Sequence, residues 1–522
     1  MLKIHQIKCP IGTTAGPDEI AAKLRCSPSD VLSHEIYRQS LDARGDELLW
    51  SYTVFAEVRN EQKYLRLKDV EEGHRYTYVC PEAPLHARRP VVVGFGPSGM
   101  FAGLILAESG LKPIILERGK MVEQRSEDVR TFFQGGELDP ESNVQYGEGG
   151  AGTFSDGKLT SRSKDPRVQK VLEEFVEAGA DPAIMYRHMP HLGTDQLQSI
   201  VRKIREKIIS LGGDVFFNTR MTSLDIRDGK LRGVNTQMGL FEADTVILCL
   251  GHSAYETWKT LYDQGFMIFQ KDFAAGVRVE HPQKLIDQNQ YGAYAGHPDL
   301  GAASYRLTHR SSNGRGVYSF CMCPGGMVIP ASTEAGALAV NGMSESSRSG
   351  DNANSAILVQ VRTSDFDKGH ALDGFLYQQK LEQNAYRTGF RAPSQNIRDY
   401  LKHCVSEQAV LASSYPLGVE PTDMHVLFTD DMNAALEEGF ASFEHKIPGF
   451  ISRGIMTGME SRSSSPIRME RDDTGQCPAY EGVFPCGEGA GYAGGIVSSA
   501  IDGIRQAEKL ILYLNRKPVR QP

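Results

Sequence analysis

The sequence lacks any apolar stretch long enough to span a membrane. Its most apolar runs, such as residues 245–250, are far shorter than the roughly 20 residues that a spanning helix needs. Residues 1–10 alternate apolar and polar side chains, without the continuous apolar core of a signal peptide. The nine cysteines are an odd number and do not show the spacing of a small disulfide-rich secreted protein. We therefore expect a soluble, cytoplasmic protein whose thiols stay reduced.

An excess of basic residues is also absent. Lys and Arg number 57 against 65 Asp and Glu, which gives a formal net charge of −8. Nucleic-acid-binding proteins usually carry a basic surface, so a nucleic-acid partner is not expected. The 522 residues are 40% apolar and 23% charged, which fits a packed protein of two or three domains. The 53 glycines are more frequent than usual and they cluster, so the clusters direct the search for a site.

A dinucleotide-binding unit is predicted from residue 91. Residues 91–93 (VVV) have the composition of a buried parallel strand, and residues 94–99 (GFGPSG) follow directly. A helix-length apolar segment comes next, and then a second strand, residues 113–117 (PIILE), which ends in an acid. A strand, a glycine-rich turn, a helix and a second strand in this order form the dinucleotide-binding motif of Rossmann-type folds.

Each position of this motif has a physical role. Gly94 permits the tight turn, Gly96 lets the backbone approach a pyrophosphate, and Gly99 lets the helix pack closely on the sheet. The helix that starts near Pro97 directs its free N–H groups at the phosphates. Glu117 is placed to accept the ribose hydroxyls and disfavours a 2′-phosphate, although Arg118 beside it weakens that inference.

The glycine-rich segments resemble those of FAD-dependent oxidoreductases of the glutathione-reductase-like superfamily. The resembling segments occur in the superfamily's order, at residues 94–99 with Glu117, 215–219 (VFFNT), 244–251 (DTVILCLG) and 485–491 (PCGEGAG). More narrowly, the chain resembles a family of mostly uncharacterised bacterial FAD-dependent dehydrogenases through residues 149–158 (GGAGTFSDGK) and 320–326 (FCMCPGG). This resemblance covers about residues 90–522 and implies FAD and the fold, but no particular reaction.

The resemblance also implies contacts between individual residues and FAD. The Val215 backbone would contact the adenine, Gly251 would mark a strand end near the cofactor, and Glu488 stands where the superfamily usually has an Asp that contacts the ribityl chain. A helix starting at 494–496 would be directed at the flavin pyrimidine ring. The expected cofactor-binding residues are Gly94, Gly96, Pro97, Ser98, Gly99, Glu117, Arg118, Gly150, Ala151, Gly152, Thr153, Val215, Gly251, Gly487, Glu488, Gly494, Gly495 and Ile496.

Candidates for the chemistry are few, because flavin enzymes mainly need the substrate positioned against the ring. Lys158 is the candidate catalytic residue, as a cation near the ring, with an ordinary solvated lysine as the alternative. Cys321 and Cys323 form a redox disulfide or a pair of buried thiols. His188 and His191 bind substrate or serve the structure, and no spacing of ligand residues predicts a metal site.

Other candidates lie in the second half of the chain. Arg315, Arg453, Arg462 and Arg468 are either a binding set for an anionic substrate or surface residues, and Cys486 is expected to pack in the interior. A second complete GxGxxG is absent, so a separate NAD(P)H domain is not expected, and NAD(P)H remains a candidate only as a transient electron donor.

These patterns predict an α/β protein with a Rossmann-type FAD-binding domain, an inserted α+β substrate domain and a small N-terminal ferredoxin-like α+β domain. We expect the N-terminal domain at 1–86, with strands near 2–7, 35–41 and 47–58 and a helix at 18–24. The FAD-binding domain is expected at 87–259, with helices at 167–179 and 194–211, and again at 451–522. The inserted cap is expected at 260–450, with strands at 275–280, 316–321 and 357–363.

The favoured function is an FAD-dependent oxidoreductase or dehydrogenase that acts on a small molecule between the FAD and cap domains. One alternative is a flavin-dependent RNA-modifying protein, which the acidic composition disfavours. The other is a non-enzymatic flavin-binding protein in which residues 1–80 form an interaction module. The sequence leaves the substrate, the electron donor and the oligomeric state open.

Overall fold

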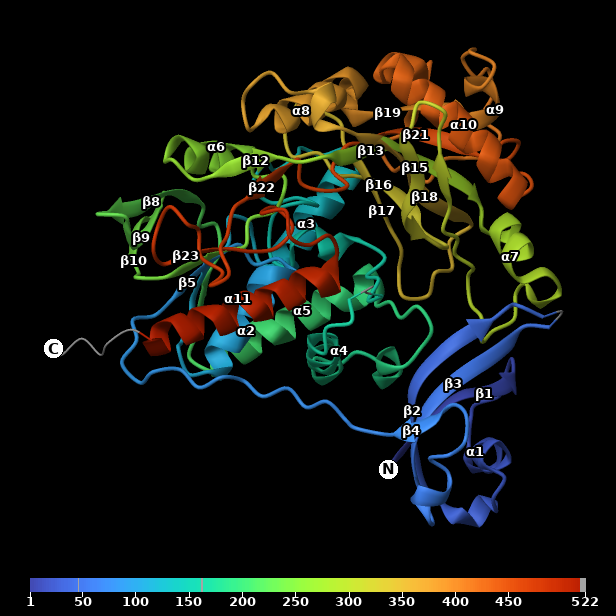
Figure 1. Cartoon of the computed structure of the whole chain (residues 1–522). Coiled ribbons are helices and arrows are strands. Elements are labelled where there is room, and N and C mark those ends of the chain that lie inside the picture. The colour runs from blue at the N-terminus through green and yellow to red at the C-terminus, as the bar shows by residue number, and fades with distance from the viewer. Residues whose placement is uncertain (46, 161–162, 517–522) are drawn as a thin grey trace.

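A five-stranded parallel sheet carries the predicted dinucleotide-binding motif. The computed structural model describes residues 1–45, 47–160 and 163–516 (Figure 1). The strands occur in the order β23 (Val483–Pro485), β11 (Val246–Leu248), β5 (Val91–Val93), β6 (Ile114–Leu116) and β7 (Asp214–Phe216). Neighbouring strands in this sheet run parallel, so the chain must cross over between them. The predicted strand–turn–helix–strand at 91–117 is confirmed by β5, a helix and β6.

Helices cover one face of this sheet. α2 is apolar on all sides and is buried along nearly its whole length, because it lies between the sheet and other helices. In Figure 1, α2, α5 and α11 run side by side, and α4 lies next to them. The predicted helices at 167–179 and 194–211 are confirmed. The helices of this region are α2 (Pro97–Glu108), α3 (Val122–Phe133), α4 (Arg167–Glu177), α5 (Gly193–Ser210) and α11 (Ile496–Arg516).

A second apolar cluster lies on the other face. It includes Trp258, which is fully buried, and joins the parallel sheet to a three-stranded antiparallel sheet. The elements of this layer are β8 (Met221–Arg227), β9 (Lys230–Thr236), β10 (Gly239–Glu242) and α6 (Tyr255–Asp263). A two-stranded sheet of β12 (Ile268–Gln270) and β22 (Ile467–Met469) follows it. The parallel sheet is therefore covered on both faces, which explains its short, continuously apolar strands.

A seven-stranded sheet forms the core of the inserted region. Its order is β14 (Thr308–Arg310), β15 (Gly316–Cys323), β18 (Asn352–Val361), β13 (Phe273–Pro282), β21 (Ile455–Glu460), β19 (Ala392–Asn396) and β20 (Val419–Pro421). The predicted strands at 275–280 and 316–321 fall within β13 and β15, and the one at 357–363 overlaps β18 but runs two residues past its end; the three strands are neighbours. The expected boundary at 450 is too early, because β21 pairs with β13 and continues the sheet.

Four helices and a hairpin complete this region. The helices are α7 (Gln283–Tyr291), α8 (Asp373–Ala385), α9 (Ile397–Tyr400) and α10 (Asp430–Lys446), and the hairpin joins β16 (Met327–Pro330) to β17 (Val340–Met343). α9 and α10 lie at the upper edge of the molecule in Figure 1, away from α2 and α11. The largest buried apolar cluster of the chain fills this region.

The N-terminal residues form a separate sheet with its own apolar core. The predicted order strand, helix, strand, strand occurs as β1 (Leu2–Pro10), α1 (Pro17–Leu24), β2 (Val31–Asp42) and β3 (Leu49–Val58), and an additional strand, β4 (Val70–Glu72), pairs with β1. The strand order is β2-β3-β1-β4. An extended segment, residues 73–90, leads from this sheet to β5 (Figure 1).

None of the helices in the described part of the chain is both long and apolar enough to cross a membrane.

Candidate cofactor site

The turn between β5 and α2 depends on two glycines for its shape and leaves a third facing open space. Gly94 has a φ of +95°, and a Cβ there would lie 2.4 Å from the Cys249 carbonyl oxygen. A Cβ on Gly99 would lie 1.8 Å from the Gly94 oxygen, so the turn and α2 can approach only without side chains. Gly96 has an ordinary φ of −75°, and its added Cβ would have no neighbour closer than 3.7 Å. The fold therefore does not require glycine at position 96, but the missing side chain keeps the space in front of the turn open.

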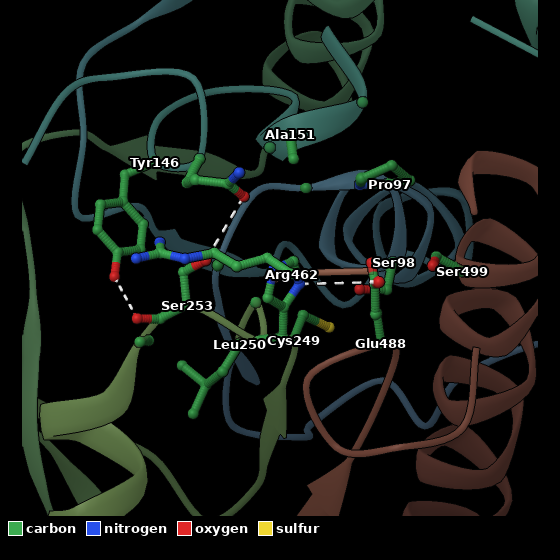
Figure 2. A pocket seen from close by; sticks show the side chains of 18 of the residues that line it. Pro97, Ser98, Tyr146, Ala151, Cys249, Leu250, Ser253, Arg462, Glu488 and Ser499 are labelled. Atoms are coloured by element: carbon green, nitrogen blue, oxygen red, sulfur yellow. Dashed lines mark hydrogen bonds and ion pairs between the residues drawn. The ribbon is translucent and has the colours of Figure 1, made fainter. Parts of the chain in front are cut away.

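That space is a cavity along the carboxyl ends of β5, β6 and β11, where open α/β sheets usually bind their ligands. Figure 2 shows its wall from close by, with Pro97 and Ser98 of α2 facing it and Glu488 beside Ser98. Segments that lie far apart in the sequence meet here. The predicted residues that line the cavity are Gly94, Gly96, Pro97, Ser98, Glu117, Arg118, Gly150, Ala151, Gly152, Lys158, Gly251, Glu488, Gly494, Gly495 and Ile496.

Four predicted residues do not line the cavity. Gly99 and Gly487 act through backbone packing, since an added Cβ would meet Gly94 and Ser98 respectively. Thr153 is buried, and its hydroxyl donates to the Glu148 carbonyl oxygen. Val215, where an adenine contact is expected, lies on the edge strand β7 and packs on the helical core.

The chain reaches the cavity a few residues after Val215. Thr219, Arg220 and Met221, which follow β7 and begin β8, line it instead. Thr219 donates its backbone N–H to the Glu117 carbonyl oxygen, which fixes this segment beside the end of β6. The part of this segment that lines the cavity therefore lies beyond the carboxyl end of β7.

Glu117 organises the backbone around it as well as lining the cavity. Its carboxylate accepts backbone N–H bonds from Phe95 at 2.8 Å, Gly119 at 2.9 Å and Gly147 at 3.0 Å. The side chain is only 5% exposed, so these bonds compensate for burying its charge. Glu117 thus ties together the glycine-rich turn and the later glycine-rich loop, a role that the sequence did not predict.

Arg125 holds the glycine-rich loop from behind. The guanidinium is fully buried and donates to the carbonyl oxygens of Asn143, Val144, Gly147 and Glu148 at 2.6–3.3 Å. One buried side chain thus binds four carbonyl groups of the loop, of which those of Gly147 and Glu148 also accept from Gly150 N–H and the Thr153 hydroxyl. Arg125 is a positioning residue that sequence reasoning missed, because nothing in the pattern of α3 distinguishes it from a surface arginine.

Glu488 and His252 form a second polar corner of the cavity. Their Oε1 and Nδ1 atoms lie 3.7 Å apart, as the dashed line beside Glu488 in Figure 2 marks. Burial raises the pKa of Glu488 to about 7, and burial together with the nearby Arg462 lowers the pKa of His252 to about 3. The His252 Nε2 atom is buried and has no hydrogen-bond partner among the described residues. Its position directly after Gly251, at the end of a buried parallel strand, was a signal for a site residue.

The amino end of α11 also faces the cavity. α11 begins at Ile496, and Gly494, Gly495, Ile496 and Ser499 line the wall. The first turn of a helix has free N–H groups and a positive dipole end, as the resemblance required near the flavin ring. The turn before it is fixed by Asp502, which accepts the Gly487 N–H at 2.8 Å and pairs with Arg471 at 2.7 Å.

The opposite wall comes from the seven-stranded sheet and the hairpin beside it. Phe320, Cys321 and Cys323 lie at an irregularity in the pairing of β15 with β18, a place where strands often turn a side chain into a site. Cys321 has a φ of +41°. Arg278 donates to the Cys321 carbonyl oxygen at 2.9 Å and also pairs with Glu460 at 2.8 Å. Asn341, Glu460 and Arg462 complete this wall.

Both cysteines are thiols in this structure. The Cys323 Sγ donates to the Cys321 carbonyl oxygen at 3.2 Å, and burial raises the pKa of Cys323. The more reactive thiolate form is therefore disfavoured at Cys323.

Lys158 lines the cavity, but its charge is shared. Nζ lies 2.9 Å from the Asp156 carboxylate and donates to the Met322 carbonyl oxygen. Asp156 also pairs with Arg348 at 2.6 Å. Although burial opposes it, these two cations hold the pKa of Asp156 below its ordinary value. Lys158 therefore links the glycine-rich loop to β15, which places a cation beside the cavity.

Three other candidates from the sequence lie outside the cavity, namely His188, His191 and Cys486. His188 lies against Trp50 of the N-terminal sheet, with ring centroids 6.4 Å apart. The His191 ring nitrogen is 3.0 Å from the Ser346 carbonyl oxygen. Cys486 is buried in the helical core, as expected.

Of the four arginines, only Arg462 lines this cavity. It forms a paired hydrogen bond with Glu382, both distances being 2.7 Å. Arg315 pairs with Asp365 at 2.6 Å, and Arg453 and Arg468 are exposed. The four side chains do not form one anion-binding set.

The residues present fit a dinucleotide of the FAD type. The space in front of Gly96 is free of side chains, helix amino ends from α2 and α11 border it, and His252 presents an unsatisfied nitrogen to it. A pyrophosphate at α2 and a ribityl chain at Glu488 would use the groups that the protein itself leaves without partners.

Comparisons with known proteins agree with this fit. The family model described as "FAD-dependent protein, C-terminal domain-like" matches residues 272–463. An uncharacterized protein of Clostridium beijerinckii is 43% identical over 505 residues, which cover 94% of this chain and 95% of that protein.

Among solved structures, a halogenase in complex with FAD is 10% identical, with a TM-score of 0.40, over 82% of this chain and 70% of that chain. Glycine oxidase from Geobacillus kaustophilus is 11% identical, with a TM-score of 0.33, over 84% of this chain and 97% of that chain. The chain belongs to the same family as the Clostridium beijerinckii protein, a family of FAD-dependent proteins, and its cofactor is FAD.

Proposed function

We propose that this protein is an FAD-dependent oxidoreductase of the glutathione-reductase-like superfamily, acting on a small molecule. The observation that carries the proposal is the composition of the cavity. One wall consists of the glycine-rich turn, the glycine-rich loop and the amino end of α11. The other consists of Phe320 and of polar side chains from β15, β17, β21 and the residues just after β21. A substrate bound at the second wall faces a cofactor bound at the first.

The chain's own groups prepare the cofactor end of this cavity. Bound FAD supplies reversible two-electron exchange with the substrate. The amino end of α11 and the Lys158 ammonium would supply positive charge beside the ring, which would favour its reduced form. Glu488 in its ionised form would accept the ribityl hydroxyl groups, and Glu117 holds the turn that would receive the pyrophosphate.

The proposal for Lys158 has its own test. Replacing Lys158 with Met removes a cation from the cavity, so the flavin is expected to become harder to reduce and its midpoint potential to fall. Lys120→Met is a matched control. Lys120, like Lys158, forms ion pairs with carboxylates, in its case Asp128 and Asp139, but it does not line the cavity. Equal potentials in the two variants would contradict a role for Lys158 at the ring.

The main experiment is a visible spectrum of the purified protein, with the released cofactor identified, followed by anaerobic addition of NADH and then NADPH. We propose NAD(P)H as a transient electron donor, so one nucleotide is expected to bleach the yellow protein. A yellow protein that neither nucleotide reduces would contradict that donor and leave direct oxidation of the substrate. A reduced protein should then be screened for the acceptor whose addition restores the colour.

A further inference from the structure

Two histidines and a glutamate meet on the outer side of the inserted region, on the elements at the upper edge in Figure 1. His403 lies in the turn after α9, His425 in the short 3₁₀ segment Met424–Leu427, and Glu437 on α10. The His425 Nε2 is 3.1 Å and the His403 Nε2 is 3.5 Å from the same Glu437 Oε1. Three segments within residues 403–437 thus bring three potential metal-binding side chains together.

The spacing of these atoms matches a tetrahedral metal centre. With Zn–N and Zn–O bonds of about 2.0–2.2 Å, neighbouring ligand atoms of a tetrahedron lie about 3.3 Å apart. The two measured distances, 3.1 and 3.5 Å, are on either side of this value. All the ligand atoms lie within 4.8 Å of one another, and a rotation of the exposed His403 ring out of its stack on His425 would complete the site.

The hydrogen-bond pattern leaves a place for a cation. Asp423 Oδ1 lies 2.9 Å from His425 Nδ1, and Glu437 Oε1 lies 3.1 Å from His425 Nε2, so each ring nitrogen faces a carboxylate oxygen. With the N–H on Nδ1, bonded to Asp423, the lone pair on Nε2 would be directed at a cation that the Glu437 carboxylate shares. A carboxylate behind the histidine is the usual partner of a metal-bound imidazole.

The central histidine is held in place before any ion binds. The His425 ring is stacked on Tyr400 at 4.0 Å and 11°, and His403 stacks on it at 4.4 Å and 23°. The Tyr400 hydroxyl donates to Asn433, which in turn donates to the His425 carbonyl oxygen. His425 is largely buried, whereas His403 is 65% exposed, so an ion can enter from solvent and water can supply a fourth ligand.

We propose that His403, His425 and Glu437 bind one Zn²⁺ ion, with Asp423 as the positioning residue. Two imidazole nitrogens favour zinc over magnesium or calcium, which prefer oxygen ligands. The ion joins the turn after α9 to α10 on the outer layer of the seven-stranded sheet, so its role is to stabilise the inserted region. The site is independent of the proposed oxidoreductase function, since none of its residues lines the FAD cavity.

The test is a titration of the FAD-loaded protein, stripped of metal with a chelator, with ZnCl₂ by calorimetry. We expect one Zn²⁺ per chain, a rise in the melting temperature on binding, and no competition from millimolar Mg²⁺. His403→Ala should lower the zinc affinity at least tenfold, and the exposure of His403 means that this variant should fold. Asp423→Asn should lower it by about tenfold, the lower end of the range for such second-layer partners.

His309→Ala is the matched control. His309 lies 3.5 Å from Glu438, a neighbouring glutamate on α10, but this pair has no third ligand within the described residues. Its zinc affinity should equal that of the unchanged protein. Failure of the unchanged protein to bind zinc, or equal zinc affinity in His403→Ala, would overturn the proposal. A change in the flavin spectrum on binding would place the ion elsewhere and would also overturn it.

Discussion

Substituting Gly96 with Val separates FAD binding from folding more cleanly than any other change in the glycine-rich turn. Gly94 and Gly99 cannot carry a side chain, because a Cβ would collide with backbone oxygens at 2.4 and 1.8 Å. At Gly96 the backbone is in an ordinary extended conformation and the nearest atom to an added Cβ is 3.7 Å away. The variant is therefore expected to fold, with its side chain in the space that the pyrophosphate needs.

The expected loss follows from the hydrogen bonds that the side chain would block. The N–H groups of Ser98 and Gly99 lie in the first turn of α2, where no intrahelical partner exists. Two hydrogen bonds to a charged group contribute about 1.5–3 kcal/mol each, so their loss weakens FAD by about 3–6 kcal/mol, or at least 100-fold.

The assay for Gly96→Val is FAD affinity by fluorescence quenching, with circular dichroism to verify folding. Gly316→Val is the control, because Gly316 has no atom within 4 Å of an added Cβ and lies outside the cavity. A folded Gly96→Val protein that retains FAD with unchanged affinity would refute the placement of the pyrophosphate at this turn.

Three further predictions concern the groups around the cofactor. Glu117→Gln should lower the FAD affinity and should also lower the free energy of unfolding of the FAD-free protein by about 1–3 kcal/mol, because the amide group would face backbone N–H donors. Unfolding curves that superimpose on those of the unchanged protein would contradict the role of Glu117 in holding the turn and the loop together. FAD affinity should rise by up to about tenfold per pH unit as the pH increases towards 7 and level off above 8, because the raised pKa of Glu488 means that ribityl binding must first remove a proton. Glu488→Gln should abolish this pH dependence, and its persistence in titrations between pH 5.5 and 8.5 would assign it to another group. Arg125→Lys should leave at least one loop carbonyl without a donor and lower the melting temperature and FAD retention together, whereas Arg130→Lys, a surface change on the same helix, should alter neither.

Local patterns were enough to predict the nucleotide-binding part of the site. The strand at 91–93, the glycines of the turn and the acid at Glu117 fall within about 27 residues, so their geometry is dictated by the steric needs of one turn. The glycine-rich start of α11, by contrast, was expected from the family resemblance. The pattern could not predict that the Glu117 carboxylate also binds backbone N–H groups of the turn and the loop, because the three donors lie in different segments of the chain.

The opposite wall of the cavity depended on contacts that no local pattern encodes. Cys321 faces the cavity because β15 is irregular against β18, whose residues come about 35 positions later. Arg462 looked like a surface arginine until its partner Glu382, 80 residues away, was found beside it. The cluster of His403, His425 and Glu437, proposed as a zinc site, likewise has no recognisable spacing in sequence.

The late place of the last strand of the parallel sheet in the sequence has a consequence for folding during synthesis on the ribosome. β23 takes an edge of that sheet beside β11, and α11 covers α2, yet both come after residue 482. Until residues 483–516 have been synthesised, the nascent chain has an incomplete nucleotide sheet and an uncovered apolar helix, while the inserted region can already fold. The FAD cavity can therefore be complete only after these residues have been added, and a chain that ends before them would expose α2 to aggregation or to chaperones.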